Sequence, residues 1–76
     1  MKKENQSQKL ANLRRERGSL SQKVEALQHL ISSDEFIQFD CRERKLIMAE
    51  YDCLNTLLTI TKARIQLREM ENGNND

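Results

Sequence analysis

The sequence predicts an all-α protein, with a short N-terminal helix followed by a helical hairpin that has one long C-terminal helix. The 76 residues include no proline and only two glycines, and the strong helix formers Leu, Glu, Lys, Arg and Gln are abundant. Apolar residues recur at spacings of three and four, the period of one helix face. Too few of them are consecutive to cross a membrane. A chain this short also buries little core alone, which favours assembly into a homo-oligomeric bundle.

The N-terminal part is basic, although the net charge of the chain is only +1. Residues 1–23 carry seven basic and two acidic side chains, and the remainder is acidic. We expect residues 1–18 to form a basic helical segment, helical from about residue 3 and anchored by Leu10 and Leu13. Gly18 then interrupts the pattern, and Ser19 is a plausible N-cap. This charge distribution suggests an anionic partner or an acidic neighbouring subunit.

Residues 19–72 are expected to form the hairpin and to be the oligomerisation domain. Its first helix, at about 20–32, has apolar residues at helical spacing, namely Leu20, Val24, Leu27 and Ile31. Ser33 can cap a single turn at the hairpin tip, which carries three large apolar residues: Phe36, Ile37 and Phe39.

The last helix is predicted to be the longest. Asp40 followed by Glu43 forms a capping box at its start, and Asn72-Gly73 supplies a stop after about Glu71. Its roughly thirty residues would span about 46 Å. Residues 73–76 are expected to be a disordered tail.

This long helix carries two apolar stripes, rotated from each other by roughly 100°. The first stripe is Ile47, Tyr51, Leu54, Leu58 and Ile65. The second stripe is Leu46, Cys53, Leu57 and Ile60. The preceding helix can cover only one of them, and soluble monomers rarely leave a long apolar strip exposed. Self-association is therefore predicted, and two stripes favour a bundle of several hairpins.

Residues with catalytic potential are few, and we expect no enzyme, cofactor or metal site. His29, the only histidine, falls on the polar side of its helix. No Cys or His pair has metal-ligand spacing, and no glycine-rich phosphate loop is present. Cys41 and Cys53 would lie about 18 Å apart along one helix, beyond disulfide reach. Either cysteine could bridge to another chain, but the interpretation that we favour is a buried free thiol at both positions.

Two cations interrupt apolar arcs. Arg64 lies in the centre of the second stripe, next to Leu67, and Lys23 lies within the apolar arc of the helix at 20–32. A cation at such a position is costly unless an anion meets it. In one interpretation, the aliphatic stem of each cation packs along the stripe, and its charge reaches water or an inter-subunit ion pair. In the other, both cations line anion-binding pockets where subunits meet, with phosphate as the natural ligand.

The chain also resembles a known family. The residues that carry the resemblance are Lys23-Val24-Glu25-Ala26-Leu27, Leu30-Ile31-Ser32-Ser33-Asp34-Glu35-Phe36, Leu54-Asn55-Thr56-Leu57-Leu58 and Ala63-Arg64-Ile65. They are similar to the phage helical-hairpin proteins that defeat cyclic-nucleotide immunity, the anti-CBASS cyclic-oligonucleotide sponge and the anti-Thoeris hairpin. The similarity covers residues 19–71, and its most specific element is the Ser-Ser-Asp-Glu-Phe turn.

The resemblance implies a homohexamer in the cytoplasm of the host cell. Such a protein binds and sequesters cyclic di- or trinucleotide second messengers without cleaving them. By resemblance, Lys23 matches a lysine of the dinucleotide pocket, and Arg64 an arginine that holds trinucleotides on threefold axes. Gln8 stands where the family has a stacking aromatic, and Glu25 replaces a threonine hydroxyl. The expected ligand-binding residues are Lys23, Arg64, Gln8 and Asn12.

The alternative is an oligomeric helical-bundle protein with a structural or regulatory role. Its basic N-terminal arm, which includes Arg14, Arg15 and Arg17, would contact nucleic acid or a partner protein. No aromatic residue interleaves these arginines, so base stacking by this segment is unsupported. We therefore expect cyclic oligonucleotides as ligands, and neither long nucleic acid nor a membrane as a partner.

Overall fold

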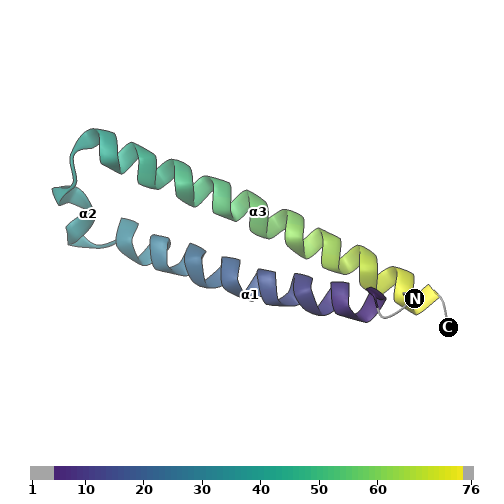
Figure 1. Ribbon diagram of the computed structural model, residues 1–76. Helices are drawn as coiled ribbons and strands as arrows, with labels where there is room; N and C mark the ends of the chain where they lie inside the picture. Colours follow the sequence, from purple (N-terminus) through teal and green to yellow (C-terminus); the bar gives the residue numbers. More distant parts are fainter. Residues whose placement is uncertain (1–4, 75–76) are drawn as a thin grey trace.

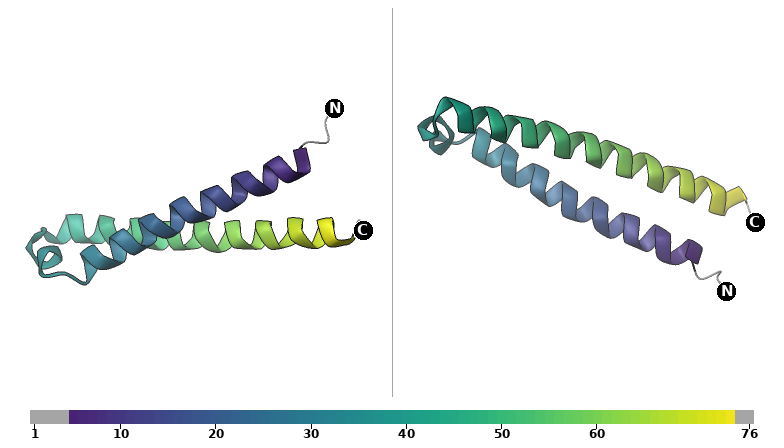
Figure 2. Two further views of the ribbon diagram at one scale, coloured as in Figure 1. Left: turned by 90° about the horizontal axis from the view of Figure 1, so that it is seen from below. Right: turned by 45° about the horizontal axis from the view of Figure 1, so that its top comes forward.

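The computed structural model describes residues 5–74, and the exposure of side chains over residues 7–71. This part of the chain forms three helices: α1 (Asn5–Ile31), α2 (Asp34–Gln38) and α3 (Cys41–Asn74). Helices α1 and α3 lie side by side and antiparallel, and the short α2 closes the tip of the hairpin (Figure 1). The result is a rod of 54 × 18 × 17 Å, in which α1 crosses α3 obliquely (Figure 2).

The sequence predicts a break or a kink at Gly18, and a separate short N-terminal helix. Helix α1 is continuous, so the break and the separate helix are wrong. Ser19 lies inside the helix and caps nothing. Buried leucines on both sides of the glycine, Leu13 and Leu20, hold this part of α1. A glycine inside a helix costs only about 0.5–1 kcal/mol relative to alanine, which this packing offsets. Residues 1–4, where the segment was expected to begin, lie outside the described part.

The hairpin tip follows the sequence closely. Ser33 occupies the N-cap position of α2 as predicted, although its hydroxyl donates to the Leu30 carbonyl at 2.7 Å instead of capping α2. Asp40 precedes α3, and its Oδ1 accepts a hydrogen bond from the Glu43 amide at 3.0 Å. That contact satisfies one of the amides left free at the start of a helix. The Asp40 half of the capping box predicted for the long helix is therefore confirmed.

The core is a single line of contacts between α1 and α3, and its most buried part lies toward the open end of the hairpin. Leu10 and Leu13 pack there against Ile65. Thr61, the most buried side chain described, is 2% exposed and donates its hydroxyl to the Leu57 carbonyl at 2.9 Å. A hydroxyl satisfied within its own helix can be buried at little cost. Toward the tip the contacts between the helices are only half-buried.

The two apolar stripes of α3 differ in their exposure to solvent, as predicted. The first stripe is buried or half-buried. The second stripe points away from α1: Leu46 is 70%, Leu57 44% and Ile60 50% exposed, and Leu67 beside them is 58% exposed. One helix can cover only one face of its neighbour, since the stripes are about 100° apart. The hairpin therefore leaves one apolar face of its longest helix uncovered.

Three further expectations concern α3 and its cysteines. Helix α3 runs to Asn74 and not to Glu71, so the stop predicted at Asn72-Gly73 is wrong. Of the expected disordered tail 73–76, residues 75–76 lie outside the described part. Cys41 and Cys53 are free thiols as predicted but are exposed, not buried. Cys41 is the first residue of α3, and Cys53 lies on the second stripe, which α1 does not cover.

Candidate anion-binding site

A hollow of about 400 Å³ lies between α1 and α3 in the open half of the hairpin. Its lining residues are Lys9, Asn12, Leu13, Glu16, Arg64 and Arg68. The two expected ligand residues Asn12 and Arg64 thus meet in one place, although they come from different helices. Buried Leu13 packs in the core below, and the polar side chains around it are exposed or half-buried. We call this the Arg64 hollow.

The charge of the Arg64 hollow is predominantly positive. Lys9, Arg64 and Arg68 supply three cations against the single carboxylate of Glu16. Guanidinium groups present planar, paired N–H donors that match phosphate oxygens. The side-chain oxygen Oδ1 of Asn12 already accepts a hydrogen bond from Nη1 of Arg15 at 3.0 Å. Its amide N–H groups remain the part of that side chain suited to an anion.

Sequence reasoning missed Lys9 and Arg68. The signal was present in their spacing: Lys9 lies three residues before Asn12, and Arg68 lies four after Arg64. Side chains at those spacings share a helix face. The spacing alone does not give the register of α1 against α3, and this register decides which side chains of the two helices line the same hollow. A smaller hollow of about 250 Å³ adjoins the same arginines and includes Leu67 and Glu71.

Lys23 lies elsewhere. It lines a hollow of about 360 Å³ near the middle of the rod, together with Ala26, Leu27, Glu50 and Leu54. Glu50 makes this hollow less positive than the Arg64 hollow. Within one chain, then, Lys23 and Arg64 occupy different hollows. Both side chains are exposed, so neither cation is buried in the single hairpin.

The remaining expected residues are peripheral. Gln8 is exposed and lines none of the hollows described here. In the basic run, Arg14 pairs with Glu69 at 2.8 Å, and Arg15 is engaged by Asn12. His29 is exposed, as expected for a residue on the polar side of α1.

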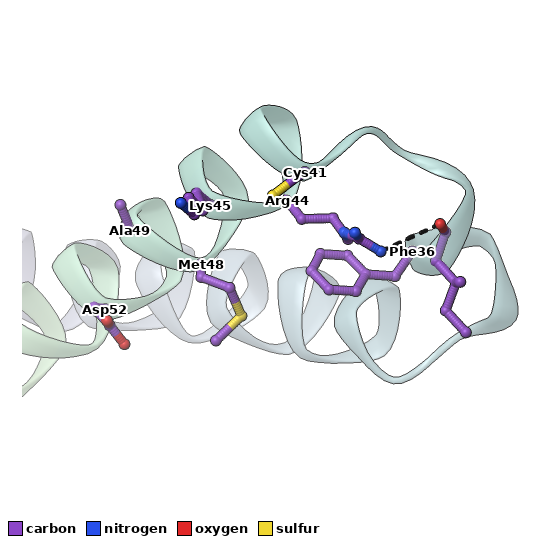
Figure 3. Close-up of a pocket in the computed structure, with 8 residues that line it drawn as sticks. Phe36, Cys41, Arg44, Lys45, Met48, Ala49 and Asp52 are labelled. Carbon is purple, nitrogen blue, oxygen red and sulfur yellow. Dashed lines mark hydrogen bonds between the residues drawn. The ribbon is translucent and has the colours of Figure 1, made fainter.

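A further hollow, of about 600 Å³, lies at the hairpin tip (Figure 3). Its lining includes Phe36, Ile37, Met48 and Ala49, and it is mainly apolar. The side chain of Arg44 lies along the Phe36 ring, and its Nη1 donates to the Ile37 carbonyl at 3.4 Å (Figure 3). This arginine thus contacts the tip from α3. The tip hollow therefore suits an apolar group better than a phosphate.

Among residues 5–74, no cluster of His, Cys, Asp or Glu side chains could hold a metal ion. In the same part of the chain, no helix has the length and apolar character needed to cross a membrane. No protein-family model, curated protein or solved structure matches this chain.

Proposed function

We propose that this protein is a phage immune-evasion protein that self-associates and sequesters cyclic di- or trinucleotide messengers in the host cytoplasm without cleaving them. The observation that supports the proposal is the Arg64 hollow. Three cations and one carboxylate line it, and an anion with several phosphate oxygens would satisfy that excess of N–H donors. Its volume lies in the range of small-molecule sites.

The neighbouring chemistry favours a small ligand over a polymer. Two of the three clustered arginines of α1, Arg14 and Arg15, have partners within the chain. The cations of the Arg64 hollow converge on one concave place, whereas a polymer would need a track of basic residues along the surface. In the sequestering mechanism, binding alone lowers the free messenger below the level that activates its receptor. That requires an abundant protein with tight sites, and no turnover.

Titration calorimetry of the purified protein against cyclic dinucleotides, cyclic trinucleotides and their linear forms tests the proposal. We expect saturable binding of at least one cyclic ligand. Arg64→Ala should weaken the binding of trinucleotides. Lys62→Ala is the matched control, because Lys62 is an exposed cation on the same helix and lines none of the hollows described here. Equal losses of nucleotide affinity in the two variants would show that the effect comes from net charge alone. That result would contradict a binding site at Arg64.

The absence of cleavage is tested separately. A cyclic nucleotide incubated with the protein should be recovered intact after denaturation. Linearised product that grows with time and protein concentration would overturn sequestration. The alternative, contact of the basic arm with a long nucleic acid, predicts affinity that falls steeply with salt because many counterions are released. A site for one small ligand predicts a shallow dependence.

A further inference from the structure

The second stripe has a near-palindromic order about Leu57. On either side of Leu57 lie, in order outward, an apolar residue, a charged residue and a leucine. In the N-terminal direction these are Cys53, Glu50 and Leu46; in the C-terminal direction they are Ile60, Arg64 and Leu67. Successive positions alternate between spacings of three and four, which is the spacing of a coiled-coil seam.

The two charged positions carry opposite signs. Glu50 lies seven residues before Leu57, and Arg64 lies seven residues after it. Among the described side chains, residues 7–71, neither makes an ion pair within 4.0 Å. Within residues 7–71, a carboxylate and a guanidinium thus have no ion-pair partner, and each lies seven residues from the centre of an exposed apolar stripe.

We propose that the occupant of this stripe is the same stripe of a second copy, running antiparallel about a twofold axis near Leu57. This rests on the self-association in the proposed function, and not on nucleotide binding. A twofold axis makes an interface self-complementary, so each residue meets its counterpart from the other half of the stripe. Arg64 of one copy then approaches Glu50 of the other, twice per pair.

The parallel alternative is disfavoured by charge. In a parallel, in-register seam, Glu50 would face Glu50 and Arg64 would face Arg64, and like charges in an apolar interface are strongly unfavourable. Antiparallel pairing replaces both repulsions with attractions and keeps the leucines together. Because a guanidinium has five N–H donors, a carboxylate on Arg64 leaves donors for a phosphate in the adjacent hollow.

Antiparallel pairing also sets which ends meet. Leu46 lies near the tip end of α3 and Leu67 near its open end, about 32 Å apart along the helix. In an antiparallel pair, Leu46 of one copy lies close to Leu67 of the other, and the two Leu46 residues are far apart. Both leucines are more than half exposed, so each can be replaced by cysteine without opening the core.

Thiol cross-linking with a short bismaleimide decides the pairing. In a background with Cys41→Ser and Cys53→Ser, Leu46→Cys and Leu67→Cys are prepared as separate proteins. We expect little cross-linking in either protein alone and abundant cross-linked dimer when the two are mixed and re-equilibrated. Efficient cross-linking of Leu46→Cys alone would overturn the antiparallel arrangement while leaving self-association intact. A monodisperse monomer in light scattering would overturn the self-association itself.

Charge exchange provides a second readout. Glu50→Arg and Arg64→Glu should each weaken association by about 10-fold, since each creates two like-charge contacts per pair. The double variant should restore association, because it exchanges the two members of the same pair. Lys62→Glu is the control for charge alone. Failure of the double variant to recover, measured by sedimentation equilibrium, would contradict contact between Glu50 and Arg64.

Discussion

Arg14 of α1 and Glu69 of α3 form an ion pair of 2.8 Å across the hairpin, 55 residues apart in the sequence. The pair lies in the same half of the rod as the Leu10, Leu13 and Ile65 cluster. It joins the two helices in the antiparallel register that brings Asn12 and Arg64 into one hollow. It also removes Arg14 from the set of free cations on the basic arm.

This ion pair should contribute little to stability. Its side chains are 50% and 49% exposed, and water screens such a pair, so a double-mutant cycle of Arg14→Ala and Glu69→Ala should give a coupling of about 0.2–1 kcal/mol. The coupling should fall further at high salt. Urea denaturation at low and high ionic strength measures it. An equivalent cycle on the looser Arg42–Asp40 contact, at 4.0 Å, is the control and should give less. A larger coupling that is insensitive to salt would show that the contact is buried by a neighbouring copy.

Gly18→Ala should stabilise the protein. Apart from its chain neighbours and the backbone of its own helix turns, a Cβ at this position meets no atom within 4 Å, and the residue lies inside a continuous helix. Alanine is favoured over glycine there by about 0.5–1 kcal/mol. Thermal unfolding of Gly18→Ala beside Arg17→Ala, which exchanges one good helix former for another, measures the difference. A loss of stability would indicate a broken helix at Gly18, as the sequence had suggested.

Ile65→Ala should be strongly destabilising, by about 2–5 kcal/mol, because it leaves a cavity in the most buried part of the core. Among residues 7–71, Ile65 is one of five buried apolar residues, so a hairpin this small has little reserve. Gln66→Ala, at the exposed neighbouring position, should change the unfolding free energy little. Circular dichroism during denaturation checks both variants. Near-equal effects would mean that the contact between α1 and α3 is not the main core.

Leu57→Glu should separate assembly from folding of the hairpin. Leu57 is 44% exposed in the single chain, so the hairpin tolerates the carboxylate, but an interface would bury it unpaired. Light scattering should show a lower mass than that of the unmodified protein. Helical content should fall only to the extent that folding of the hairpin depends on assembly. Thr59→Glu, an exposed position on α3 outside both stripes, is the matched control. An unchanged mass for Leu57→Glu would place the interface elsewhere.

Lys23 and Arg64 should serve different ligands, because they line different hollows of one chain. Arg64→Ala should reduce affinity for cyclic trinucleotides and spare dinucleotides, and Lys23→Ala should do the reverse. A hydrogen bond with a charged group contributes about 1.5–3 kcal/mol, so each loss should be roughly 10- to 150-fold. Calorimetry with both ligand classes measures it, with Lys62→Ala as control. Parallel losses for both ligands would mean one shared site.

Much of the fold was predictable from local chemistry. The absence of proline, the Asp40 cap and the two stripes of α3 are properties of short stretches, and they specify helices and a turn without reference to the rest of the chain. The angular separation of the stripes also predicted that one would stay exposed. Lys23 and Arg64 could be identified as candidate ligand-binding residues because the sequence alone shows a cation within an apolar arc, which is unusual.

The tertiary structure decided what depends on contacts between helices. A break or kink was predicted at Gly18 because helix propensity considers each residue by itself. In the folded hairpin, Leu13 and Leu20 on either side of the glycine are buried, and α1 continues through it. The cysteines were expected to be buried because burial is typical of the residue type, but each lies where α1 does not cover α3. The Arg64 hollow likewise exists only in one antiparallel register, since that register alone sets Lys9 and Asn12 opposite Arg64 and Arg68.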